Sequence, residues 1–242
     1  MTAPSTVLLV HGAWHGAWCF AALQHALDEL GVPSLAVDLP GHGASTEPLT
    51  DLYGDADQVV RVLAQQAAPV VLVGHSYGGA VITEAAARHG AVHHLVYLTA
   101  FALEQDESVM GMLASLPDAR VQLGKAMQFR DDGTSVLDPE LAAPALYGDC
   151  EPAPVQAALA RLSPQPMLNL GQPSTGDPRR TIPSTYVRCL RDQAIHIDHQ
   201  DAMAARCDDV VTLDCDHSPF LSRVAETAAL IARIAGAEGG RS

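Results

Sequence analysis

The residues that point most directly to chemistry are the six at positions 74–79, Gly-His-Ser-Tyr-Gly-Gly. They stand between a short, β-branched apolar run at 69–73 and an Ala-rich run at 80–88. The first run predicts a buried strand, and the second predicts a helix because Ala, Glu and Arg have high helix propensity. A Gly-x-Ser-x-Gly sequence between a strand and a helix is typical of a nucleophile elbow, in which the serine sits on a sharp, strained turn. We therefore predict that Ser76 is a nucleophile, exposed at the end of a strand in front of a helix N-terminus.

A serine hydroxyl needs a base to take its proton and an acidic group to orient that base. With a nucleophile elbow the chain order is Ser, then acid, then His. His217 follows a predicted strand at 209–213, and loops at the carboxyl ends of parallel strands are where ligands meet such a sheet. The other histidines after Ser76 stand beside a strand start or in a predicted helix, so His217 is the predicted base.

The orienting acid is expected at the same end of the preceding strand, predicted at 184–190. Asp192 follows that strand directly. A carboxylate there would hold the imidazole in one tautomer and stabilise the imidazolium that forms. Asp192 is the predicted acid, and four other aspartates stay open as alternatives: Asp198, Asp201, Asp214 and Asp216.

The negatively charged oxygen of an acyl-transfer intermediate needs two N–H donors that are already in place. One is expected from Tyr77, directly after the nucleophile, and the other from the loop after the first strand. In that loop Gly12 permits a tight turn, and the N–H group of Ala13 is the predicted donor. Gly12, Trp14 and Ser218 are the residues that we expect to border the substrate. For the Trp14 side chain, packing under the loop is the alternative.

Runs of strand length alternate with helical runs over most of the chain. The predicted strands lie at 6–10, 34–37, 69–73, 92–99, 184–190 and 209–213, and the predicted helices at 17–30, 49–67, 80–88, 199–206 and 222–235. This alternation predicts an α/β fold, a mostly parallel sheet with helices on both faces. From 101 to 183 the rhythm breaks into Pro- and Gly-rich sequence with short helical pieces at 108–116 and 152–162. We interpret residues 101–183 as a lid inserted into a core domain made of residues 1–100 and 184–242.

The composition fits one large globular domain, with 242 residues of which 48% are hydrophobic and 17% charged. A net charge of −14 argues against binding to nucleic acid or to an anionic membrane surface. No apolar stretch is long enough to span a bilayer, and residues 1–5 lack the features of a signal peptide. The five cysteines form no Cys-x-x-Cys pair. Together these features predict a reduced, cytoplasmic protein whose cysteines pack as small hydrophobes.

Four segments resemble the α/β-hydrolase superfamily: HGAWHGAW at 11–18, DLPGHG at 38–43, GHSYGG at 74–79 and DHSPF at 216–220. The first and third together resemble, more narrowly, the branch that contains plant methylesterases, hydroxynitrile lyases and small bacterial esterases. The resemblance covers about residues 5–100 and 184–235 and leaves the lid unmatched. It implies the α/β-hydrolase fold.

Carried over by position, the resemblance places the family's nucleophile, acid and base on Ser76, Asp192 and His217. It places the family's oxyanion donors on Ala13 and Tyr77. These positions agree with those inferred from the residues themselves.

Two positions depart from the lyases of that branch. Some of them carry Thr where this chain has Gly12, and Lys where this chain has Ser218. In those enzymes the lysine stabilises the leaving cyanide, so its absence argues against the lyase reaction here. Plant methylesterases tend to have an apolar residue at position 218, so Ser218 leaves the substrate open.

The sequence therefore predicts a serine hydrolase that cleaves a small, fairly hydrophobic carboxylic ester through an acyl-enzyme, with no cofactor. Three alternatives stay open: acyl transfer or cyclisation in a biosynthetic pathway, hydroxynitrile-lyase-like carbon–carbon cleavage, and a non-enzymatic ligand receptor on the same fold. A small-molecule ester is the predicted partner, and a homodimer is an open alternative to a monomer. No metal is expected, because the histidines at 196 and 199 lack the spacing of a metal site. The glycines after the first strand do not match a dinucleotide-binding pattern.

Overall fold

Six parallel strands form the central sheet of the computed structural model, which describes residues 4–67, 69–116 and 121–237. The strand order is β2-β1-β3-β4-β8-β9. The bounds are β1 Val7–Val10, β2 Ser34–Val37, β3 Val70–Ser76, β4 Val92–Ala100, β8 Ser184–Cys189 and β9 Asp209–Leu213. These strands lie where the apolar runs predict them, and β3 extends through the nucleophile position.

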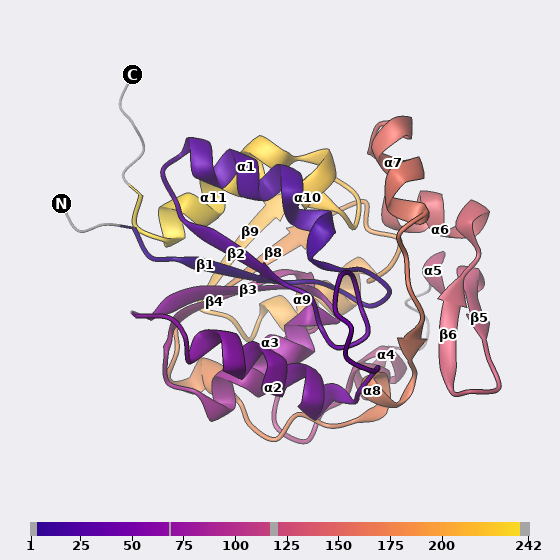
Figure 1. Cartoon of the computed structure of the whole chain (residues 1–242), viewed down its shortest axis with the longest axis horizontal. Helices are drawn as coiled ribbons and strands as arrows, with labels where there is room; N and C mark the ends of the chain where they lie inside the picture. Colours follow the sequence, from indigo (N-terminus) through magenta and orange to yellow (C-terminus); the bar gives the residue numbers. More distant parts are fainter. Residues whose placement is uncertain (1–3, 68, 117–120, 238–242) are drawn as a thin grey trace.

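Helices cover both faces of this sheet (Figure 1). On one face lie α1 Ala21–Glu29, α10 Pro219–Ser222 and α11 Val224–Ile234, and on the other α2 Leu52–Leu63, α3 Gly78–Arg88 and α9 Ile197–Ala204. Side chains of β3 alternate between the two layers: Val71 and Val73 pack with α1 and α11, whereas Val70 and Leu72 pack with α2 and α3. Both faces of the sheet are therefore buried, which confirms the predicted α/β fold.

The predicted helices differ in extent from the observed ones. The run at 17–30 begins as a 3₁₀ turn at Ala17–Phe20 before α1. The helix predicted at 49–67 is shorter, because the Asp51 side chain caps its start by accepting from Gly54 N at 2.9 Å. The helix predicted at 222–235 is observed as α11, and the short α10 precedes it. None of the described helices is long and apolar enough to cross a lipid bilayer.

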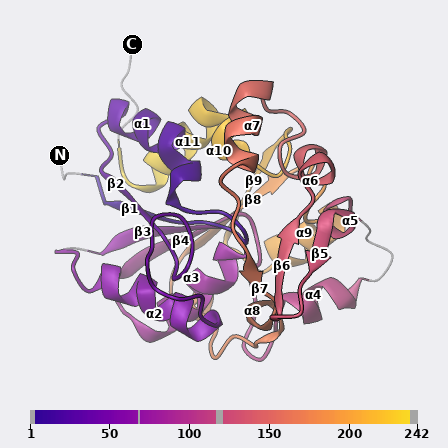
Figure 2. The same cartoon turned by 45° about the vertical axis from the view of Figure 1, so that its right-hand side comes forward.

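The segment 101–183 contributes no strand to the central sheet in its described residues, 101–116 and 121–183. It forms a small antiparallel sheet of its own, in the order β5-β6-β7, which the sequence did not predict. The bounds in this segment are α4 Val109–Ser115, α5 Leu123–Ala126, β5 Met127–Phe129, β6 Thr134–Leu137, α6 Pro139–Leu146, α7 Pro152–Leu159, β7 Gln165–Pro166 and α8 Leu168–Gly171. Figure 2 shows these elements gathered at one end of the molecule, away from the chain termini. Their role as a lid stays a prediction.

The strand order places a topological switch point beside β1. The chain passes from β1 to β2 on one side and then returns to form β3 on the other side of β1. In open parallel sheets the crevice outside the carboxyl ends of such strands is where ligands bind. The loops that follow β1 and β3, which hold the predicted oxyanion donors and Ser76, therefore meet at this crevice.

Candidate active site

Ser76 ends β3 in a backbone conformation that non-glycine residues rarely adopt, with φ +53°. The turn is tight because α3 starts two residues later, and a Cβ atom on Gly78 would lie 2.4 Å from the Val10 carbonyl oxygen. Only glycine fits this close approach of two backbone segments. The Phe101 N–H group donates to the Ser76 carbonyl oxygen at 3.1 Å and holds the turn in place. The strained serine is the local geometry that the Gly-x-Ser-x-Gly pattern predicts.

Asp192 and His217 are hydrogen-bonded to each other at the carboxyl ends of β8 and β9. The distance between His217 Nδ1 and Asp192 Oδ2 is 2.6 Å, and both side chains are buried. Three further donors reach the same carboxyl group: Thr99 Oγ1, Ala194 N and Ile195 N. Because Asp192 accepts from all of these groups, His217 Nδ1 is the donor in their shared bond. The lone pair of His217 is then on Nε2, where a base needs it.

The alternative aspartates have other partners. Asp214 and Asp201 are exposed and pair with Arg191 and Arg188, respectively. Asp216 is buried and accepts from Ser222 Oγ at 2.6 Å. Among the described residues, Asp192 is the carboxyl group that contacts the His217 ring.

The His217 loop is tied to the residue next to the predicted nucleophile. His75 Nε2 donates to the His217 carbonyl oxygen at 2.8 Å, and the two ring centroids are 4.6 Å apart. Within the described residues, no hydrogen bond joins the Ser76 hydroxyl to the His217 ring. Nucleophile–base hydrogen bonds are often long in enzymes without substrate and shorten on binding. The structure thus joins His217 to Asp192 and places the His217 loop next to His75, the neighbour of Ser76.

The N–H groups of Ala13 and Tyr77 are both available at the crevice. Neither group donates a hydrogen bond to another described residue, and both residues border the same cavity as Ser76. Each of the two peptide units is held by its carbonyl oxygen. Gly12 O accepts from His11 Nδ1 at 2.8 Å, and Ser76 O accepts from Phe101 N. Because C=O and N–H point in opposite directions in a trans peptide, these bonds turn both N–H groups the other way.

The cavity at this crevice is small and almost wholly apolar. It encloses about 80 Å³. Its lining residues are Ala13, Trp14, Ser76, Tyr77, Phe101, Val109, Met110, Leu113, Leu123, Met127, Leu170, Ala194 and Ile195. Most of the apolar side chains come from the segment 101–183, so that segment shapes the space above Ser76.

The three residues expected to border substrate lie in different surroundings. Trp14 lines the cavity, and its Nε1 donates to the Ser135 carbonyl oxygen at 3.2 Å, so the indole also connects the loop to β6. Gly12 packs directly against the nucleophile, since a Cβ atom there would lie 2.8 Å from the Ser76 Cβ. Ser218 is fully buried, and its hydroxyl has no partner among the described residues.

Three buried histidines around His217, namely His11, His15 and His75, have lowered pKa values and are neutral near pH 7. Burial lowers the pKa values of His11 and His75 well below the usual 6.5, and lowers the pKa of His15 to about 4. A positive charge on the His217 ring would therefore meet no cation on these three neighbours. Among the described residues, no group of three or more His, Cys, Asp or Glu side chains is placed to hold a metal ion.

Thr99 is a site residue that the sequence interpretation missed. Its hydroxyl donates to Asp192 Oδ2 at 2.5 Å, and its backbone has φ +40°. Thr99 stands at the carboxyl end of the predicted strand at 92–99, and that position was the available signal. A hydroxyl there can donate to the predicted acid, Asp192, which follows the neighbouring strand.

Comparison with known proteins identifies the family. A family model described as the alpha/beta hydrolase family matches residues 7–230. This chain belongs to the alpha/beta hydrolase family. An alpha/beta hydrolase, nvfD, of Aspergillus novofumigatus is 30% identical over 246 residues, which cover 95% of this chain and 96% of that protein.

Two further relatives define the branch of this hydrolase. The pFDCC methylesterase MES16 of Arabidopsis thaliana is 27% identical over 237 residues, covering 89% of this chain and 88% of that one. The crystal structure of a pyrethroid hydrolase from Sphingobium faniae JZ-2 has a TM-score of 0.81 and 25% identity, covering 96% of this chain and 98% of that one. These similarities confirm the predicted fold, the methylesterase-like branch and the enzyme class, a serine hydrolase of carboxylic esters.

Proposed function

We propose that this hydrolase cleaves a small, fairly hydrophobic ester with Ser76 as nucleophile, His217 as general base and Asp192 as the orienting acid. The observation that carries the proposal is the buried hydrogen bond between Asp192 and His217. The His217 loop is also hydrogen-bonded to His75, the residue before the strained Ser76. This arrangement provides a base whose tautomer is fixed, beside a hydroxyl that projects from a sharp turn.

In the proposed reaction, Ser76 Oγ attacks the ester carbonyl carbon while its proton passes to His217 Nε2. The N–H groups of Ala13 and Tyr77 stabilise the oxyanion. His217 then gives the proton to the alcohol oxygen as the C–O bond breaks, which leaves an acyl group on Ser76. Water attacks this acyl group, gives a proton to His217, and the acid leaves as the Ser76 hydroxyl is restored.

The cavity supports a compact apolar group on the substrate. Its volume of about 80 Å³ is well below the roughly 300–1,000 Å³ of pockets that enclose drug-sized ligands. Its lining is hydrophobic apart from Ser76, so desolvating a charged or hydroxylated group there would cost free energy. Relatives named for methylesterase and pyrethroid hydrolase activity agree with an ester substrate.

The test is the Ser76→Ala variant, assayed with p-nitrophenyl acetate. We expect its turnover to fall to the rate of the uncatalysed reaction while the thermal unfolding temperature stays close to that of the parent. A fluorophosphonate should label the parent on the peptide that contains Ser76, and Ser45→Ala, at a serine outside the crevice, should be labelled like the parent. Near-parent turnover by Ser76→Ala would refute the covalent mechanism.

We also propose a cytoplasmic location, supported by the five cysteines, all of which are free thiols. The homodimer stays a prediction, and measuring the mass in solution by light scattering tests it.

A further inference from the structure

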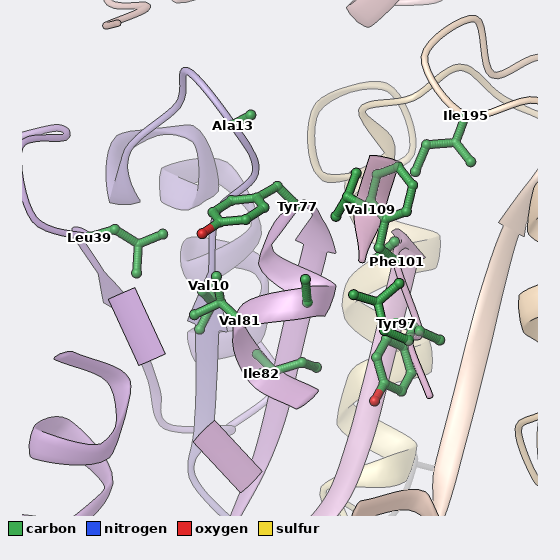
Figure 3. Packing of buried hydrophobic residues seen from close by; sticks show 14 of the residues in the cluster. Val10, Ala13, Leu39, Tyr77, Val81, Ile82, Tyr97, Phe101, Val109 and Ile195 are labelled. Carbon is green, nitrogen blue, oxygen red and sulfur yellow. The ribbon is translucent and has the colours of Figure 1, made fainter. Parts of the chain in front are cut away.

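The Tyr77 side chain points away from the cavity that its backbone borders. In Figure 3 its ring extends from the end of β3 towards Leu39, on the side opposite Phe101 and Val109, which line the cavity. The side chain is buried, with 1% of its surface exposed. A buried phenol needs a partner for its hydroxyl, and nothing in the proposed reaction uses this one.

The hydroxyl is held by two buried polar side chains from opposite parts of the chain. Tyr77 Oη donates to Asp55 Oδ2 at 2.7 Å, and Asp55 belongs to α2. Asn169 Nδ2 donates to the same Asp55 oxygen at 2.8 Å and lies 3.2 Å from Tyr77 Oη. Asn169 belongs to α8, in the segment predicted to be the lid. Asp55 and Asn169 are each 1% exposed, so these bonds are shielded from water.

The same two elements are fastened together next to this cluster. Gln172, just after α8, accepts from Leu52 N at 2.8 Å and donates to Asp51 Oδ2 at 3.0 Å. Leu170, the neighbour of Asn169, lines the cavity. The packing of α8 on α2 thus positions both Leu170 in the cavity wall and Asn169 beside the Tyr77 hydroxyl.

We propose that Asp55 and Asn169 are positioning residues that anchor Tyr77 by its hydroxyl and so hold the Tyr77 N–H group where the oxyanion forms. Because Asn169 belongs to α8, the position of this N–H group is coupled to the packing of α8 on α2. The peptide that carries this N–H group is held at its carbonyl end by Phe101 N and at its other end by the anchored tyrosine. Oxyanion stabilisation depends on donors that are fixed before the charge develops. This inference rests on the proposed role of the Tyr77 N–H group.

The test compares Tyr77→Phe, Asp55→Ala and their combination in steady-state hydrolysis of p-nitrophenyl acetate. Alanine removes the acceptor, whereas an asparagine oxygen at position 55 would still accept from Tyr77 Oη. Losing an oxyanion donor outright typically costs about 10²–10³ in kcat. A donor that is kept but loosely held should cost about tenfold. We expect kcat to fall about tenfold in each single variant, with KM within about twofold, and to fall no further in the double variant because both changes break the same contact.

Two measurements separate positioning from a purely structural role. A trifluoromethyl ketone forms a serine adduct that carries the oxyanion, so its inhibition constant should rise about tenfold in step with the loss of kcat. Tyr53→Phe is the matched control, because the Tyr53 hydroxyl also joins α2 to the segment after α8, through Pro173 O at 3.0 Å. Among the described residues, no hydrogen bond joins it to Tyr77. Tyr53→Phe should keep kcat within about twofold of the parent.

Unchanged kcat in Tyr77→Phe and Asp55→Ala, or losses that multiply to about a hundredfold in the double variant, would overturn the inference. If Asp55→Ala does not fold, Tyr77→Phe with Asn169→Ala carries the same test, since both leave Asp55 in place. Ser76→Ala keeps the two proposals apart. An inactive Ser76→Ala beside a fully active Tyr77→Phe refutes the anchoring alone, whereas an active Ser76→Ala refutes the covalent mechanism.

Discussion

Replacing Asp192 by Asn tests the proposed acid, because the two carboxyl oxygens have different partners. Oδ1 accepts from two backbone donors, Ala194 N at 2.6 Å and Ile195 N at 2.9 Å. Oδ2 accepts from Thr99 Oγ1 and from His217 Nδ1. An asparagine has one oxygen and one NH₂ group, so one of the two sides must face a donor.

The backbone decides which side that is. An NH₂ group in the Oδ1 position would face two N–H groups that cannot rotate, whereas the Thr99 hydroxyl can rotate to accept a hydrogen bond. The amide introduced by Asp192→Asn is therefore expected to turn its NH₂ group towards His217. His217 must then accept at Nδ1 and carry its proton on Nε2, where it can no longer receive the Ser76 proton.

We expect Asp192→Asn to lower kcat about 10⁴-fold, the loss found when a triad histidine is held in the wrong tautomer. That factor corresponds to about 5 kcal/mol of transition-state stabilisation. The measurement is kcat for p-nitrophenyl acetate at neutral pH, with circular dichroism to verify folding. Asp214→Asn, at an exposed aspartate that pairs with Arg191, should stay within about twofold of the parent. A folded Asp192→Asn variant that keeps a tenth of the parent kcat would refute this assignment, as would an equal loss in Asp214→Asn.

Two further predictions concern stability and the nucleophile turn. Burial, helped by the nearby charge of Asp51, raises the pKa of Asp55 from 3.8 to about 7, although the hydrogen bonds from Tyr77 and Asn169 lower it. The folded chain therefore binds this proton more tightly than the unfolded chain. The stability that this binding contributes below about pH 4 is lost as the pH rises to 7. Between pH 5 and 8 the parent should lose about 3 kcal/mol relative to Asp55→Asn in urea unfolding, and parallel pH profiles of the two proteins would contradict this. Gly12→Ala should lower kcat about a hundredfold, the scale of a misplaced reacting group, because its Cβ would lie 2.8 Å from the Ser76 Cβ. Gly90→Ala, where a Cβ meets nothing within 4 Å, is the control, and equal kcat values in the two variants would exclude the steric argument.

The central sheet and the order of the site residues were predictable because both follow from local patterns and one topological rule. Apolar runs mark buried strands, and the carboxyl ends of parallel strands share one edge. Positions just after strands at that edge therefore become neighbours, however far apart they are in sequence. Asp192 and His217 are 25 positions apart, and this rule alone predicts that they lie close together.

The rest of the site depends on contacts that no local pattern encodes. The strands β5, β6 and β7 have two to four residues each, too few to show a period. The bond between Asn169 and Asp55 spans 114 positions and joins two single polar side chains. In the sequence, Asp55 is one polar residue in a helical run and cannot be told from a solvent-facing position. Only the packing of α8 on α2 turns it into a buried acceptor.

The buried polar contacts of the segment 101–183 converge on the loops that would do chemistry. Tyr147 donates to His15 Nε2 at 2.7 Å, and His15 Nδ1 in turn donates to the Ala13 carbonyl oxygen at 2.8 Å. Asp149 N donates to Asp216 Oδ2, next to His217. Since interior polar groups are costly to leave unpaired, this segment cannot shift far without disturbing the groups around Ser76. Its apolar lining and its polar contacts therefore have separate effects: exposed lining residues such as Met110 can change the shape of the cavity, whereas the buried contacts set how firmly the reactive loops are held.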